Sequence, residues 1–153
     1  MIDVGDKAPD FSLQNQDDES VSLADHKGEK VVLYFYPKAD TPGCTTQACG
    51  IRDRSDEYEA AGATVIGVSA DEPKKLRKFA DKYDLDFTLV GDPSHDVLEQ
   101  YGVWVEKKNY GKTYMGIQRA TFIIDGDGTV AYVIPKASPK THDDQVLAAL
   151  AEL

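Results

Sequence analysis

A strand-to-helix junction that holds both cysteines of the chain is formed by Val31-Val-Leu-Tyr-Phe-Tyr36-Pro37-Lys-Ala-Asp-Thr41-Pro42-Gly43-Cys44-Thr-Thr-Gln-Ala-Cys49. The run from Val31 to Tyr36 is rich in β-branched and aromatic residues, which predicts a buried strand that ends before Pro37. Thr41 suits the N-cap of a following helix. Pro42 suits its first position because the N–H that proline lacks would be unpaired there. The stretch therefore predicts a strand, a loop and a helix, with Cys44 in the first helical turn.

This placement favours a reactive thiol at Cys44. The backbone N–H groups of a first helical turn have no partners within the helix and carry a positive partial charge. That charge stabilises a thiolate relative to the neutral thiol, and only the thiolate is a good nucleophile. A buried, inert cysteine is the alternative. The preceding Thr-Pro-Gly sequence and the second thiol five residues later favour the reactive interpretation.

Cys49 is expected to lie on another side of the same helix. Five residues of α-helix separate the two Cα atoms by about 8.5 Å, beyond the limit of about 7 Å for a disulfide without backbone movement. A bond between Cys44 and Cys49 within one chain therefore requires the first helical turn to unwind, and Gly43 and Gly50 should make that unwinding easier. The alternative is a partly buried cysteine that never pairs.

Three segments resemble the peroxiredoxins of the peroxiredoxin Q, or bacterioferritin comigratory protein, type. The first is the segment from Tyr34 to Asp53, which contains Pro-x-x-x-Thr-x-x-Cys. The opening segment from Val4 to Leu13 resembles the usual start of that family, and the segment from Arg119 to Asp125 resembles its second active-site segment. The resemblance covers nearly the whole chain.

The resemblance implies a role for each matched residue in peroxide reduction. Cys44 matches the peroxidatic cysteine, which attacks the peroxide and becomes a sulfenic acid, and Cys49 stands where this subgroup carries its resolving cysteine. Thr41 matches the hydroxyl that orients the peroxide, and Pro37 matches the proline that shields the pocket from water. Arg119 matches the arginine that stabilises the thiolate and the leaving oxygen, although an arginine at a strand start is more often only a surface residue.

Peroxide chemistry also makes physical sense for this set of groups. Cleavage of an O–O bond leaves negative charge on oxygen, so donors aimed at that oxygen lower the barrier. Arg119 and the backbone N–H groups of Gly43 and Cys44 are the expected donors. A sulfenic acid left exposed proceeds to sulfinic acid, which is normally irreversible, and a partner thiol prevents this. Gln47 stands where related sequences often carry Glu, which implies an altered environment around the site.

The composition limits the remaining classes of function. A chain of 153 residues with 41% hydrophobic and 29% charged residues suits one compact domain, Met1–Leu153. The net charge of −10 argues against nucleic-acid binding. No apolar run is long enough for a membrane span, and the first residues do not resemble a signal peptide. With both cysteines assigned to the site, a reducing, cytoplasmic location is expected. A monomer is sufficient for an intrachain disulfide, and a weak homodimer is compatible with it.

The order of predicted elements favours an α/β protein with a thioredoxin-like fold and an N-terminal extension, Met1–Glu29. Strands and helices alternate through the first half, which indicates a partly parallel sheet, and Asp125-Gly-Asp-Gly128 predicts a hairpin turn. The expected strands are Val31–Tyr36, Thr64–Ser69, Phe87–Val90, Arg119–Ile124 and Thr129–Ile134. The expected helices are Pro42–Ala61, Pro73–Tyr83, Asp96–Tyr101 and His142–Leu153.

No metal or cofactor is expected. The three histidines are scattered, and the cysteine spacing is wrong for a zinc site. The turn at Asp125–Gly128 superficially resembles a calcium loop, but Lys136 occupies the position of the bidentate glutamate. The aromatic residues Tyr101, Trp104 and Tyr110 are expected in the core or at a pocket rim.

The sequence is compatible with three functions. The first is a thiol peroxidase that reduces hydrogen peroxide or small organic hydroperoxides and is recycled by a dithiol such as thioredoxin. The second is a thiol–disulfide oxidoreductase, although that chemistry prefers Cys-x-x-Cys. The third is a redox-sensitive binding or chaperone protein, in which unwinding around Cys44 and Cys49 is itself the signal.

Overall fold

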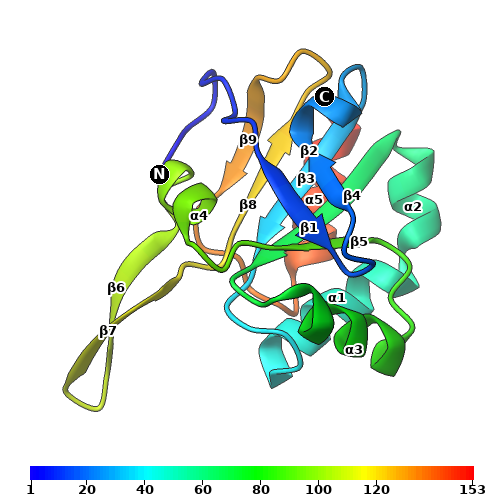
Figure 1. Cartoon of the computed structure of the whole chain (residues 1–153). Helices are drawn as coiled ribbons and strands as arrows, with labels where there is room; N and C mark the ends of the chain where they lie inside the picture. The colour runs from blue at the N-terminus through cyan, green and yellow to red at the C-terminus, as the bar shows by residue number, and fades with distance from the viewer.

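A seven-stranded mixed sheet forms the centre of the computed structural model, which describes Met1–Leu153, and a separate two-stranded hairpin projects from it (Figure 1). The strands are β1 (Ser12–Asn15), β2 (Ser20–Ser22), β3 (Lys30–Phe35), β4 (Ala63–Ser69), β5 (Thr88–Gly91), β6 (Trp104–Asn109), β7 (Lys112–Ile117), β8 (Ala120–Ile124) and β9 (Val130–Ile134). The helices are the 3₁₀-helix η1 (Leu23–His26) and the α-helices α1 (Pro42–Asp53), α2 (Ser55–Ala60), α3 (Pro73–Tyr83), α4 (Asp96–Gln100) and α5 (His142–Ala151).

The sheet has the strand order β2-β1-β5-β4-β3-β8-β9. Strand β3 lies between β4, which runs parallel to it, and β8, which runs antiparallel. Strands β8 and β9 form the hairpin that the Asp125–Gly128 turn predicts. The predicted mixed sheet is therefore confirmed, and β3 leads from its centre directly to the cysteine-bearing helix α1.

Two apolar clusters pack on opposite faces of the sheet, because neighbouring side chains of β3 point in opposite directions. One face carries α1, α2, α3 and α5, and the other carries η1 and α4. From β3, the first cluster takes Val32, Tyr34 and Tyr36, and the second takes Val31, Leu33 and Phe35.

The helix predicted over Pro42–Ala61 is wrong as a single element. The backbone leaves the helical conformation at Arg54, with φ −113° and ψ 21°, and α2 then begins at Ser55. The Arg54 side chain contacts Glu57 in the next turn and Asp144 on α5. The break thus brings Arg54 between two carboxylates, a tertiary interaction that helical periodicity does not reveal.

The N-terminal extension is part of the sheet. Strand β1 pairs antiparallel with β5, and β2 pairs with β1, so the sheet is two strands wider on this side than predicted. The strands β1 and β2 have only four and three residues, and none of these residues is fully buried, so they lack the apolar run by which longer strands are recognised.

The β6–β7 hairpin was not predicted. The residues of this hairpin near its turn are polar or exposed, so the alternation of apolar and polar side chains that is typical of a half-buried strand is weak. Tyr110 at its turn is 98% exposed, and its assignment to the core or a pocket rim is wrong. Tyr101 is fully buried, and the Trp104 ring stacks on His95 with 3.9 Å between ring centroids.

No helix of the structure combines the length and the apolar character that crossing a membrane requires. The structure also contains no group of three or more histidine, cysteine or acidic side chains placed to hold a metal ion.

Candidate active site

Cys44 lies in the first turn of α1, at the edge of the sheet where β3 ends. Thr41 occupies the N-cap with extended backbone angles, and Pro42 is the first helical residue, as predicted. The Cys44 side chain is only 2% exposed and packs in the same cluster as Ala48 and Ile51, one and two turns further along the helix. The buried face of α1 therefore carries the thiol toward the sheet.

Arg119 reaches Cys44 from a distant part of the sequence. Phe35 pairs with Ala120 in the β3–β8 ladder, so the loop that leaves β3 lies beside the residue that precedes β8. The Arg119 Nη2 donates to the Cys44 sulfur at 3.4 Å. The sheet register thus brings the predicted nucleophile and the predicted cation together, although 75 residues separate them.

Gln47 fixes the other branch of the guanidinium. This side chain is completely buried, and its Oε1 accepts a hydrogen bond of 2.6 Å from Arg119 Nη1. Gln47 stands one turn after Cys44, so both acceptors for Arg119 project from one side of α1. The two Nη atoms of the planar guanidinium match this spacing, and the two hydrogen bonds together fix the orientation of the Arg119 side chain beside the Cys44 sulfur.

Gly43 provides the space that Arg119 occupies. A Cβ on Gly43 would lie 3.1 Å from Arg119 Nη2, which is tighter than side chains normally pack, and at an ordinary van der Waals distance of 3.5 Å from Pro139 Cγ. The first turn of α1 is therefore in close contact with the guanidinium and with the loop before α5.

Thr41 and Pro37 lie in the loop between β3 and α1. The Thr41 hydroxyl donates to the Lys38 carbonyl oxygen at 2.8 Å and makes no capping bond to the helix. Half-buried Pro37 directly follows the buried Tyr36. These positions put both residues close in sequence to Cys44, while a direct interaction of the Thr41 hydroxyl with sulfur remains a prediction.

Cys49 and Cys44 are both free thiols within the same continuous helix. Cys49 is half-buried, whereas Cys44 is buried. The adjacent Gly50 lies against α5 so closely that a Cβ there would collide with the Asp143 carboxylate. Gly50 therefore serves helix packing, in addition to the flexibility that the sequence suggests.

A buried polar cluster that the sequence did not reveal lies behind the thiol. His142, the first residue of α5, is completely buried, and its Nε2 forms a hydrogen bond of 2.8 Å with the Thr121 hydroxyl on β8. Its ring packs against Tyr34, which is opposite Thr121 in the sheet. Burial and the Arg119 guanidinium lower the pKa of His142 to about 4, so the ring is neutral at physiological pH.

The geometry of the site defines a class of protein. A mixed α/β sheet presents a buried thiol at a helix start, and a guanidinium fixed by a second hydrogen bond faces the sulfur. Such a site stabilises a thiolate and also negative charge that develops on an atom bound beside it. The class is a thiol enzyme with redox chemistry at sulfur.

Comparison with known proteins identifies the family within this class. The AhpC/TSA family matches residues 4–133. Peroxiredoxin Bcp of Escherichia coli (strain K12) is 52% identical over 151 residues, which cover 99% of this chain and 97% of that protein. The chain belongs to the AhpC/TSA family and is a thioredoxin-fold peroxiredoxin of the Bcp or peroxiredoxin Q type, a thiol peroxidase.

Solved structures agree with this assignment. The crystal structure of peroxidoxin BcpB from Mycobacterium tuberculosis has a TM-score of 0.89 at 37% identity and covers 100% of this chain and 99% of its own. The bacterioferritin comigratory protein of Xanthomonas campestris, described with alkyl peroxide reduction activity, has a TM-score of 0.88 at 36% identity. That match covers 93% of this chain and 90% of the Xanthomonas chain.

Proposed function

We propose that this peroxiredoxin reduces hydrogen peroxide and small organic hydroperoxides with Cys44, that Cys49 resolves the oxidised Cys44 as an intrachain disulfide, and that a dithiol such as thioredoxin regenerates the enzyme. The observation that carries this proposal is the contact of Arg119 with the Cys44 sulfur at 3.4 Å, at the start of α1. The alkyl peroxide activity described for the Xanthomonas relative supports organic hydroperoxides as substrates.

In the first step, the Cys44 thiolate attacks the terminal oxygen of the hydroperoxide. An S–O bond forms, the O–O bond breaks, and the remaining oxygen leaves as hydroxide or alkoxide and takes a proton. Arg119 and the backbone N–H groups of Gly43 and Cys44 stabilise the negative charge as it moves from sulfur to oxygen. Thr41 orients the peroxide, and Pro37 limits access of water to the sulfur.

The second step requires a change in α1. The product sulfenic acid is neutral, so the charge-assisted contact between Arg119 and the sulfur weakens once Cys44 is oxidised. The first helical turn is then held less tightly and unwinds, which brings Cys44 within bonding distance of Cys49. Cys49 then attacks the Cys44 sulfur, the disulfide forms, and the hydroxyl leaves as water.

A dithiol reductant completes the cycle by two thiol–disulfide exchanges, each through a mixed disulfide. Thioredoxin is the proposed partner, in a reducing, cytoplasmic setting. All the proposed catalytic residues come from one chain, so a monomer is sufficient.

The test is a steady-state assay with hydrogen peroxide, thioredoxin, thioredoxin reductase and NADPH, run beside an insulin-reduction assay. We expect peroxide-dependent NADPH consumption without accelerated insulin reduction, and complete loss of peroxide reduction in Cys44→Ser. Insulin reduction without peroxide consumption would favour a thiol–disulfide oxidoreductase instead. Retained peroxidase activity in Cys44→Ser would overturn the proposed mechanism.

A further inference from the structure

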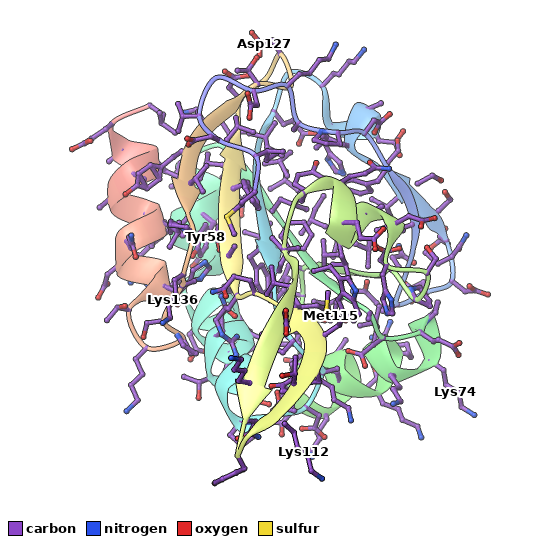
Figure 2. The ribbon with its side chains drawn as sticks, turned by 90° about the vertical axis from the view of Figure 1, so that its left-hand side faces the viewer. Tyr58, Lys74, Lys112, Met115, Asp127 and Lys136 are labelled. Atoms are coloured by element: carbon purple, nitrogen blue, oxygen red, sulfur yellow. The ribbon has the colours of Figure 1, made fainter.

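Lys107 on β6 belongs to the surroundings of Cys44, although it is distant from α1 in the sequence. The hairpin β6–β7 runs into β8 through Ile117, Gln118 and Arg119, so its base is joined directly to the arginine of the site. In Figure 2, which faces the left-hand side of Figure 1, this hairpin stands in front of the molecule with Lys112 near its lower end.

The register of the hairpin decides which side chains share a face. Lys107 is opposite Tyr114, and Val105 is opposite Gly116. Directly opposite residues lie on the same face of an antiparallel pair, and so do residues two apart on one strand. A Cβ on Gly116 would lie only 3.2 Å from Lys107 Cδ and 3.6 Å from its Cε. The Lys107 stem therefore lies along the hairpin over Gly116, toward the end that joins Arg119.

Lys107 differs from the other lysines of the chain. Its neighbours Glu106 and Lys108 are exposed, whereas Lys107 is half-buried. The other half-buried lysine, Lys30, donates to the carbonyl oxygen of Leu153 at 3.3 Å. The Lys107 ammonium makes no hydrogen bond and no ion pair within the protein, although the backbone of Lys107 pairs with β7. Its ammonium is thus partly removed from water without an anionic partner, an arrangement that favours binding of an anion.

The Lys107 ammonium interacts electrostatically with two groups of the site, the Arg119 guanidinium and the Cys44 sulfur. Partial burial lowers the pKa of Lys107, the Arg119 guanidinium lowers it further, and the Cys44 sulfur opposes both. The ammonium therefore lies within electrostatic range of the sulfur and the guanidinium. It forms no hydrogen bond to the sulfur, whereas Arg119 does. The stem lies over Gly116, toward the end of the hairpin that joins Arg119, so the ammonium is further from the sulfur than the guanidinium and on the side where a more distant part of a substrate would lie.

We propose that Lys107 is a specificity residue that binds the carboxylate of acidic organic hydroperoxides while their O–O group reacts at Cys44. The inference rests on the proposed peroxidase function and names a substrate class for it. The net charge of −10 makes the protein as a whole repel anions, so a preference for an acidic substrate requires a local cation such as this one. Tyr114, on the same face, offers an apolar surface for the carbon chain of the substrate.

The test compares a hydroperoxide that carries a carboxylate four to six carbons from its O–O group with the methyl ester of the same compound. The measured quantity is the ratio of the second-order rate constants for acid and ester within each enzyme, at about 0.15 M salt, where distant surface charges are screened. We expect the wild-type protein to prefer the acid by about five-fold, the upper end for a solvent-accessible ion pair.

The variants separate the charge of Lys107 from its packing. Lys107→Met keeps an unbranched stem over Gly116 and should bring the ratio to one or below. Lys107→Arg should keep the preference, and Lys107→Glu should reverse it. Lys108→Met is the matched control, since Lys108 is adjacent, exposed and on the opposite face, and its ratio should equal that of the wild type.

Two outcomes would overturn the inference while the peroxidase function stands. Equal rates for acid and ester in the wild-type protein would show that no carboxylate site exists. Equal slowing of acid, ester and hydrogen peroxide in Lys107→Met, with an unchanged ratio, would show that Lys107 acts on the thiolate and not on the substrate. Failure of the proposed function is distinct, because the wild-type protein would then consume none of the three peroxides.

Discussion

The two ends of the α1–α2 segment are fixed in different ways. At the start of α1, one guanidinium makes the external polar contacts, to Cys44 at 3.4 Å and Gln47 at 2.6 Å, and the Thr41 hydroxyl makes no capping bond. Beyond Cys49, side chains tie the segment to α5: Arg54 contacts Asp144 at 2.6 Å, and the Tyr58 hydroxyl donates to Asp143 at 2.5 Å.

This difference suits the proposed unwinding of α1 at one end only. In the proposed cycle the contact of Arg119 with Cys44 weakens when oxidation removes the charge of the sulfur, whereas the contacts of Arg54 and Tyr58 do not involve either cysteine. Cys49 stands between the two ends. We therefore expect the start of α1 to be released when Cys44 is oxidised, while the end beyond Cys49 remains attached to α5.

Among variants that keep the Cys44 thiol, the largest effect is expected from Cys49→Ser. The first turnover should keep its rate, because Cys49 takes no part in cleavage of the O–O bond. Recycling by thioredoxin should be lost, and Cys44 should over-oxidise to sulfinic acid. Stopped-flow peroxide consumption, coupled turnover and the mass of the chain check this. Normal coupled turnover in this variant would mean that a thiol from outside the chain resolves Cys44.

Arg119→Ala should slow the peroxide step by about 100-fold, the size expected when one donor to a developing oxyanion is removed. Arg54→Ala is the matched control, since it removes an arginine from the anchored end of the same segment. It should leave the second-order rate constant with hydrogen peroxide unchanged. Equal slowing in both variants would show that the effect of Arg119 is on helix stability and not on chemistry.

Acid should destabilise the protein through His142. Its pKa is about 4 in the folded state and about 6.5 unfolded, so the unfolded chain binds more protons between these values. The stability that neutral His142 contributes is fully present above about pH 6.5 and is lost as the pH falls toward 4, by up to ~3 kcal/mol. Urea unfolding of the reduced protein at several pH values measures this change.

His142→Gln provides the comparison that isolates the histidine. Burial raises the pKa of the neighbouring Asp143, which gives a pH dependence of the opposite sign, and this contribution is present in both proteins. The wild-type protein should therefore lose more stability than His142→Gln between pH 7 and pH 4.5. Parallel pH profiles for the two proteins would contradict the assignment.

The smallest expected effect is that of Tyr58→Phe at the anchored end. Loss of the hydrogen bond to Asp143 should lower the free energy of unfolding by about 1 kcal/mol. Disulfide formation after peroxide addition should keep its rate, because α1 unwinds at its other end. Urea unfolding and quenched-flow thiol counting measure the two quantities. A marked change in the rate of disulfide formation would show that the two ends of the segment move together.

The parts of the structure that the sequence predicted well are those with strong local signals. The strand predicted over Val31–Tyr36 is β3, Lys30–Phe35, and Thr41 and Pro42 begin α1 as their cap preferences require. The resemblance to peroxiredoxins identified Arg119, and the β3–β8 register explains physically why that residue lies beside Cys44.

The parts that were missed depend on tertiary contacts. The break at Arg54 coincides with carboxylates from two helices, and the short strand β1 exists through pairing with β5. His142 carried no signal in the sequence, because its burial results from how α5 packs against β8 and β3. Lys107 carried no signal in the sequence that distinguishes it from the other lysines, because its position over Gly116 depends on the register of a hairpin that was not predicted.

A single-turnover titration tests the central claim most directly, that one chain carries both the reactive thiol and its resolving partner. The reduced protein is mixed with one equivalent of hydrogen peroxide in the absence of reductant, and free thiols and the mass of the chain are followed. The account predicts rapid loss of both thiols, a mass lower by two hydrogens, and a peptide that links Cys44 to Cys49. A mass higher by one or two oxygens, with the Cys49 thiol intact, would contradict it.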